Sequence, residues 1–132
     1  MSHNGLVSVA SCVSARETLD RLVAALATRR LTVFARIDHA EGAASVGLPL
    51  RPTEVVIFGD PKGGTALMQD RQPAGIDLPL KALVWEDADG KAWFGYNDPA
   101  WIAERHGLGA ASAAAVKAMA GLLSAIAQEA TQ

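Results

Sequence analysis

Residues 53–65 read Thr53-Glu54-Val55-Val56-Ile57-Phe58-Gly59-Asp60-Pro61-Lys62-Gly63-Gly64-Thr65, so an apolar run passes directly into a glycine- and proline-rich turn. A nearly continuous apolar run of this length is typical of a strand in the middle of a sheet. The residues after the turn, near 64–69, predict a short helix. We therefore expect a central strand that ends at a helix N-terminus, a place where ligands often bind.

The flanking segments predict further helices and strands. Ser14 and Glu17 have the capping-box spacing, which predicts a helix over residues 15–30. Apolar and β-branched residues predict strands over 6–10 and over 31–37, with the odd-numbered residues of the second strand on one face. Helices are expected over 40–47, over 98–107 with Asp98 as N-cap and Gly107 as stop, and over 112–128.

The most specific pairing signal is a hairpin in the C-terminal half. Residues 80–86 and 92–96 flank a turn that contains Asp89-Gly90, a pair that favours the positive φ of tight hairpin turns. Trp85 and Trp93 lie on its two arms and are expected to pair across the strands. The element order predicts an α+β fold with two layers, one mixed β-sheet with helices packed on it. At 132 residues, the chain is expected to form a single domain, 1–132.

Composition narrows the function classes. The net charge of −2 and a pI near 5.9, without a basic run, disfavour nucleic-acid binding. The sequence shows no signal peptide and no membrane span, so a soluble cytoplasmic protein without membrane partners is expected. Cys12 is the only cysteine and is expected to be buried and inert, and the histidines His3, His39 and His106 are scattered. No cofactor and no metal site are therefore expected.

Short motifs occur in one order along the chain: Phe34-Ala35-Arg36-Ile37-Asp38-His39, Arg51-Pro52-Thr53-Glu54, Phe58-Gly59-Asp60-Pro61, Asp77-Leu78-Pro79-Leu80-Lys81 and Tyr96-Asn97-Asp98-Pro99. This combination resembles the DUF302 family, also called TT1751-like, over about residues 8–108, with the Ala-rich helix of 109–132 outside the resemblance. The resemblance implies a compact α+β domain that is often a homodimer, and it implies no reaction. A typical member has Asn where this chain has Asp60, which places an anionic side chain near any phosphate bound there.

The candidate ligand-binding residues are polar positions at or near the ends of predicted strands: Asp38, His39, Gly59, Asp60, Lys81 and Tyr96. The turn after Phe58 lacks the Gly-Lys-Thr order of a P-loop, so it predicts either a plain strand-to-helix turn or a backbone anion nest. Asp38 is expected either to cap a helix or to accompany His39 as a general base. Lys81 is expected to pair with an acid such as Glu54, or to bind a ligand.

These observations leave three functions open. The leading hypothesis is a homodimeric, non-enzymatic domain that binds a small ligand or a partner at a pocket shared by the candidate residues. The first alternative is an enzyme that uses His39 or Lys81 in acid/base chemistry on a small metabolite. The second is an assembly module in which the tryptophans and the C-terminal helix form an interface.

Overall fold

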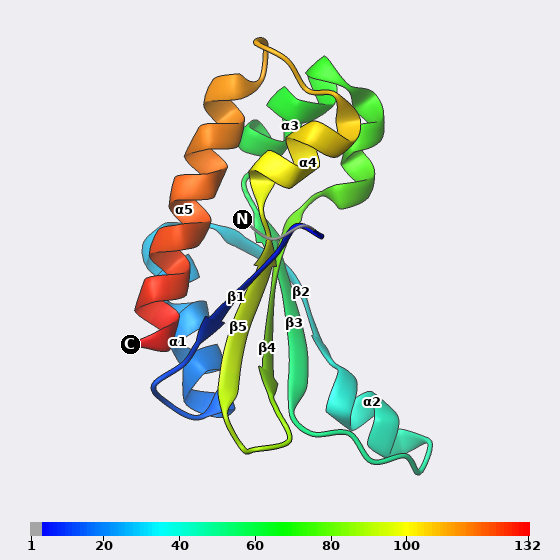
Figure 1. Cartoon of the computed structure of the whole chain (residues 1–132), viewed down its shortest axis with the longest axis vertical. Helices are drawn as coiled ribbons and strands as arrows, with labels where there is room; N and C mark the ends of the chain where they lie inside the picture. Colours follow the sequence, from blue (N-terminus) through cyan, green and yellow to red (C-terminus); the bar gives the residue numbers. More distant parts are fainter. Residues whose placement is uncertain (1–3) are drawn as a thin grey trace.

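The computed structural model describes residues 4–132, which form one five-stranded sheet with helices on one face and at both ends (Figure 1). The elements follow in the order β1 (Leu6–Ala10), α1 (Ala15–Thr28), β2 (Thr32–Asp38), α2 (His39–Ser45), β3 (Thr53–Gly59), α3 (Pro61–Asp70), the 3₁₀ helix η1 (Gln72–Asp77), β4 (Leu80–Glu86), β5 (Ala92–Asn97), α4 (Pro99–His106) and α5 (Ala113–Thr131).

The α+β prediction is confirmed, but the sheet is antiparallel throughout and not mixed. Its strand order is β1-β5-β4-β3-β2, and every neighbouring pair runs antiparallel. β1 and β2 run in the same direction, as a β-α-β unit requires, yet they lie at opposite edges with three strands between them. The connection through α1 therefore passes behind the sheet from one edge to the other, and no parallel pair forms.

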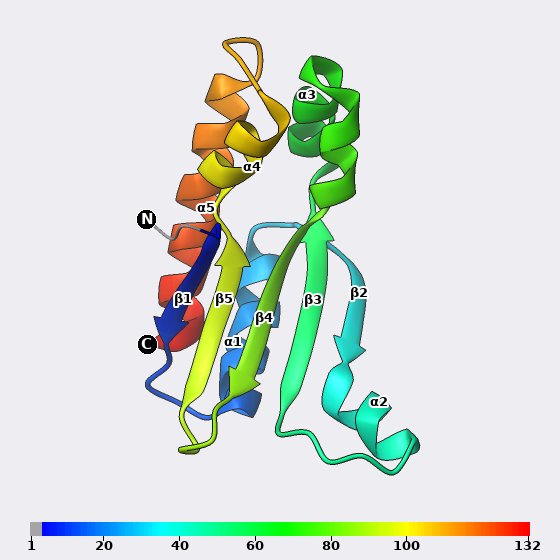
Figure 2. The same cartoon turned by 45° about the vertical axis from the view of Figure 1, so that its right-hand side comes forward.

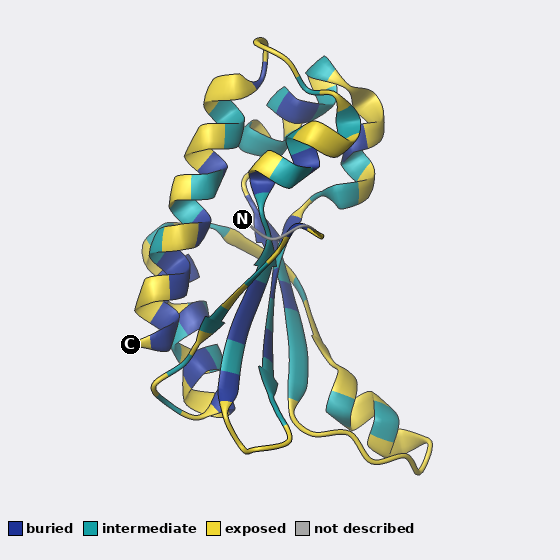
Figure 3. Cartoon of the chain, viewed as in Figure 1, coloured by how far each residue is buried: buried dark blue, intermediate teal, exposed yellow. Residues whose placement is uncertain are grey.

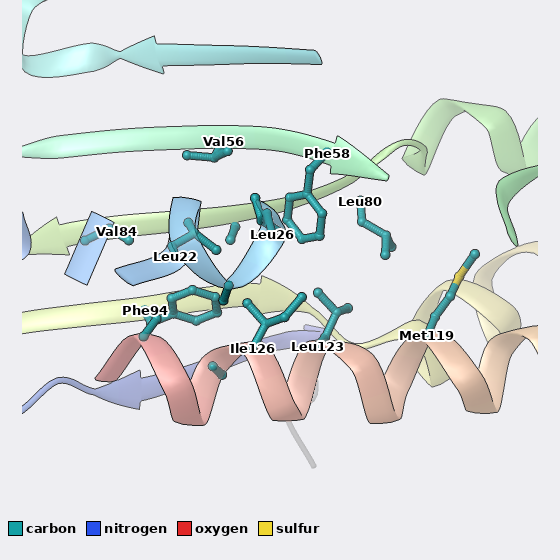
Figure 4. Packing of buried hydrophobic residues seen from close by; sticks show 14 of the residues in the cluster. Leu22, Leu26, Val56, Phe58, Leu80, Val84, Phe94, Met119, Leu123 and Ile126 are labelled. Carbon is teal, nitrogen blue, oxygen red and sulfur yellow. The ribbon is translucent and has the colours of Figure 1, made fainter. Parts of the chain in front are cut away.

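One face of the sheet is covered by α1 and α5, and the core lies between (Figures 3 and 4). Alternate residues of the central strands point into it, including Val56, Phe58, Val84 and Phe94, all of which are fully buried. From the helices, the core receives Leu22, Leu26, Leu123 and Ile126. The Ala-rich C-terminal helix thus packs on its own sheet, and its apolar stripe is buried against that sheet.

The predicted hairpin is confirmed. Trp85 lies opposite Trp93, and their rings stack with centroids 6.3 Å apart at 14°. Gly90 closes the turn with a φ of 78°. The shared face predicted for β2 is wrong, because the register shifts between Val33 and Ala35 and so places them on different faces.

The two ends of the sheet differ. At one end α3, η1 and α4 form a helical cap beside the start of α5 (Figure 2). Two carboxylates hold this cap together: Asp70 accepts hydrogen bonds from the Ser112 hydroxyl at 2.6 Å and the Gly109 N–H at 3.0 Å, and Asp77 contacts α4. At the other end only α2 and the loop after it project from β2 and β3.

Candidate functional site

The six residues predicted to share a pocket do not meet in one. Asp38 pairs with Glu54 at one end of β3, whereas Gly59 ends that strand. Five residues of extended chain separate the two positions by about 17 Å. The Asp38-His39 pair and the Gly59-Asp60 turn therefore lie at opposite ends of the sheet.

Asp38 is the N-cap of α2, as the simpler interpretation predicted. Its carboxylate accepts the Glu41 N–H at 2.9 Å. His39 begins the helix, is exposed, and makes no side-chain hydrogen bond with any residue in the range 4–132. This pair carries no built general base.

The predicted ion pair between Lys81 and Glu54 is wrong, because the two side chains lie on opposite faces of the sheet. Lys81 is opposite Ile57 on the uncovered face, whereas Glu54 is opposite Val84, whose side chain points into the core. Glu54 instead accepts a hydrogen bond from Arg36 Nε at 2.6 Å. In the described part of the chain, Lys81 is thus the only charged strand residue on the uncovered face.

Tyr96 belongs to the covered face and not to a pocket with Lys81. It lies opposite Ala82 and meets the ring of Phe94 edge-on, with centroids 6.2 Å apart at 65°. Burial, with a smaller contribution from the charge of Asp98, raises the pKa of the Tyr96 hydroxyl above its usual value of 10.0. Its position is that of a packing residue.

The turn after β3 is a strand-to-helix turn and not an anion nest. Asp60 caps α3 by accepting the Lys62 N–H at 3.1 Å, and its carbonyl accepts the N–H groups of Gly63 at 3.1 Å and Gly64 at 3.4 Å. Pro61 has no N–H to offer. The first turn of α3 therefore holds no unused donor for a phosphate.

A half-open cavity of about 450 Å³ nevertheless begins at this turn. It lies between α3, the N-terminal half of α5, η1 and the adjoining end of the sheet, and Gly59 and Asp60 are the only predicted site residues that line it. Its walls are otherwise almost entirely apolar, and Figure 4 shows Met119 projecting from α5 on the side of Leu80. The site that remains from the prediction is thus an apolar cavity with one carboxylate.

Sequence reasoning missed the α5 side of this cavity. Ala115, Ala118, Met119 and Leu122 line it, some 50 positions after the turn. The glycines and alanines were visible in the sequence, but no local signal pairs α3 with α5.

A second surface stands out because no helix covers it. Figure 2 looks onto the face of the sheet opposite α1 and α5. By strand alternation and register it carries Leu6, Ser8, Ala10, Thr32, Ala35, Ile37, Thr53, Val55, Ile57, Gly59, Lys81, Leu83, Trp85, Trp93, Gly95 and Asn97. We call this set the open face. It is mainly apolar and contains no carboxylate.

Asp77 has a structural role, because it ties α4 to η1. His106 Nε2 lies 2.5 Å from Asp77 Oδ2, and Arg105 donates to both oxygens of Asp77 at 2.9 Å. Cys12 is exposed, contrary to the prediction. Within residues 4–132 no three His, Cys, Asp or Glu side chains gather as a metal site, and His3 lies outside that range. No helix in the same range is long and apolar enough to span a membrane.

Comparisons with known proteins agree with this fold. A family model described as "Domain of unknown function DUF302" matches residues 7–126, and so continues beyond Leu108 into α5. The crystal structure of an uncharacterized conserved DUF302 protein from Bacillus stearothermophilus superimposes with a TM-score of 0.84 at 18% identity, over 97% of this chain and 98% of that one.

Curated relatives carry another name. Proteins of Brucella suis and Brucella abortus called "Fluoride-specific ion channel FluC 1" are 52% identical to this chain over 116 residues. The matched part is 88% of this chain but 46% and 43% of those proteins. The chain thus spans less than half the length of the curated relatives that it matches.

Proposed function

This chain belongs to the DUF302 family, and we propose that it is a non-enzymatic binding domain that works as a homodimer through its open face. The observation that supports this proposal is an apolar sheet face without a helix over it. Sheets with one solvated face normally alternate apolar and polar residues. Here both faces are apolar, which favours a second protein layer.

The chemistry of the open face suits a second copy of itself. Lys81 is its only charged strand residue, so two copies meeting face to face place few like charges together. Near its centre the indole of Trp85 lies over Gly95 beside Leu6: a Cβ at Gly95 would lie 2.8 Å from Trp85 Cζ3 and 3.3 Å from Leu6 Cδ1. Apolar sheet faces pack on one another in sandwiches.

The available area is sufficient for a dimer. Five strands about 4.8 Å apart, with about six residues of 3.4 Å rise each, outline roughly 480 Å² per copy. Two copies would bury about 1,000 Å², near the lower bound for a specific interface.

The segment from α2 to Pro52 adds to this area. It projects from the sheet on the side away from α1 and α5 (Figure 1), and none of the residues of α2 is buried (Figure 3). Val46, Leu48 and Leu50 are 71%, 61% and 49% exposed. Exposed apolar residues of this kind support the proposed interface, and the segment would reach around the edge of a second copy.

The oligomeric state tests this proposal. We expect light scattering coupled to gel filtration to give twice the 13.8 kDa of one chain. Leu83→Glu places a charge in the middle of the open face and should yield a folded monomer. The matched control Ala114→Glu, at an exposed position on α5, should remain dimeric. A monomeric wild-type chain at high concentration, or a dimeric Leu83→Glu variant, would contradict the proposal.

Acid/base catalysis has less support. It needs His39 or Lys81 in a cleft with an acid partner. Neither side chain forms a hydrogen bond or ion pair with any residue in the range 4–132, and neither lines the 450 Å³ cavity.

Cytoplasmic location stays a prediction.

A second candidate function is suggested by the curated relatives: an accessory domain of an ion channel. In the Brucella proteins named fluoride-specific ion channels, the matching segment accounts for less than half of the length. Since no helix within residues 4–132 can span a membrane, a pore would belong to the remainder. This chain would then regulate or stabilise a channel and would not conduct.

Fluoride efflux from liposomes tests the accessory role. The Brucella suis protein would be compared with and without the segment that matches this chain. We expect efflux to persist without the segment but to change in rate, and to recover when this chain is added separately. Identical efflux in all three preparations, or complete loss that the added chain does not restore, would exclude an accessory role.

A further inference from the structure

We infer that the cavity between α3 and α5 binds a small hydrocarbon-rich molecule with one amine or other cationic group, and not a carboxylate or a phosphate. This inference does not depend on the homodimer, because it rests on the lining of a cavity at the end of the sheet, of which Gly59 is the one residue that also belongs to the open face. Three features carry it: the size of the cavity, the nature of its walls, and the placement of its single charge.

The size fits a small ligand. A volume of about 450 Å³ lies within the range of small-molecule sites, roughly 300–1,000 Å³. At about 30 Å³ per liquid-packed heavy atom, the volume of one water, it holds about 15 non-hydrogen atoms. The cavity is open at one side, where Asp60 and Thr65 are exposed.

The walls are hydrocarbon and thioether. Small residues on the facing helices, Gly63 and Gly64 on α3 and Ala115 and Ala118 on α5, leave the space between them. A Cβ at Gly63 would lie 3.4 Å from the Met119 methyl group, so even small side chains would narrow it. Met119 and Met68 both line the cavity, and flexible thioethers adapt to apolar ligands of different shape.

The charge at the mouth is negative. Among residues 4–132, Asp60 is the only ionisable residue in the lining, which contains no Lys, Arg or His from that range. Its Oδ1 accepts the Lys62 N–H, whereas Oδ2 accepts no hydrogen bond from any residue in the range 4–132. An ammonium group placed there would gain a charge-assisted hydrogen bond.

An anionic ligand finds no partner at the same place. The N–H groups of Lys62, Gly63 and Gly64, which could have formed an anion site at the start of α3, already donate to Asp60. A carboxylate in the cavity would therefore lie beside a carboxylate, without a donor to offset its desolvation. The geometry thus separates a cationic amphiphile from its anionic counterpart.

Calorimetric titration with three matched probes tests this inference: dodecylammonium, dodecanol and dodecanoate, each below the concentration at which it aggregates. We expect one dodecylammonium per chain, with an affinity at least tenfold higher than that for dodecanoate. Asp60→Asn keeps the helix cap, because Asn is an equally good N-cap. This variant should lose about tenfold in affinity for dodecylammonium and nothing for dodecanol.

A second pair of variants locates the binding. Ala118→Phe fills the cavity from the exposed side of α5 and should weaken dodecylammonium and dodecanol at least tenfold, whereas Ala114→Phe, outside the lining, should weaken neither. Circular dichroism confirms that both variants fold. Equal affinity for dodecanoate and dodecylammonium, unchanged binding by Ala118→Phe, or no saturable binding by the wild-type chain would overturn the inference.

Discussion

Gly95→Ala is the change that probes the open face most directly, because a single methyl group meets the indole of Trp85. The new Cβ would lie 2.8 Å from Cζ3 and 3.2 Å from Cη2. Carbon atoms pack at about 3.5 Å or more, so the ring must rise by at least about 0.7 Å. The indole is half-buried and can move outwards in an isolated chain.

The cost to folding should be small. Overpacking destabilises by about 1–3 kcal/mol, and replacing a strand glycine with alanine recovers about 0.5–1 kcal/mol. The net loss in free energy of unfolding of the monomer is therefore about 0–2.5 kcal/mol. Urea unfolding measures it, and the change in Trp85–Trp93 stacking should alter the near-ultraviolet circular dichroism.

The cost to the dimer should be larger. A gap of 0.5–1 Å forfeits a quarter to a half of the dispersion attraction, and a tryptophan at the centre of an interface contributes about 2–4 kcal/mol. Because each dimer contains two such contacts, the loss is about 1–4 kcal/mol, which raises the dissociation constant by about fivefold to nearly a thousandfold. Sedimentation equilibrium measures this constant.

Gly121→Ala is the matched control, since no heavy atom lies within 4 Å of a Cβ at that α5 position. It should stabilise the helix by up to about 1 kcal/mol and leave the dimer unchanged. If Gly95→Ala changes the tryptophan signal but not the dissociation constant, the open face is not the interface. If it changes neither, Trp85 does not lie over Gly95 in solution.

Three further predictions concern single polar groups. Tyr96 is the only tyrosine, and an ultraviolet titration should place its pKa above 10. Because the folded-state pKa is raised, the contribution of Tyr96 to stability is fully present below pH 10 and is lost as the pH rises through the folded-state pKa. The hydrogen bond from Ser112, and then that from the Gly109 backbone, lowers the pKa of Asp70, so stability present above pH 4 should fall on acidification, and Asp70→Asn should flatten that decline in acid unfolding curves. Asp77→Ala leaves the half-buried His106 without its partner and should reduce urea stability by about 2 kcal/mol, whereas Asp77→Asn should lose less; equal losses would show that the carboxylate geometry is unimportant.

Local signals in the sequence predicted most of the elements. Ser14, Asp38 and Asp98 each cap the helix they were expected to cap, because capping involves residues only two or three positions apart. The Asp89-Gly90 turn fixed the hairpin and with it the Trp85–Trp93 pair for the same reason. Features that depend on residues close together in the sequence, such as helix caps and tight turns, could therefore be predicted from the sequence.

Non-local relations could not be read in this way. The parity of Lys81 relative to Glu54 depends on the register of two strands joined by α3 and η1, and a shift of one residue moves a side chain to the other face. The register shift near Phe34 altered the faces of β2 in the same manner. The cavity is even harder to predict from the sequence, because α3 and α5 lie side by side only through the positions that the sheet gives them.

The sequence around Asp60 contains enough information to distinguish an anion nest from an ordinary capped turn. Two glycines at a helix start allow either an anion nest or an ordinary capped turn, and the glycines themselves are the same in both. The preceding residue decides between them: a carboxylate at the N-cap binds the first N–H itself and brings its own negative charge, so an anion would meet repulsion where it needs donors. Asp60 therefore converts a position that would favour phosphate into one that favours a cation, and the apolar walls behind it determine that this cation must be attached to hydrocarbon.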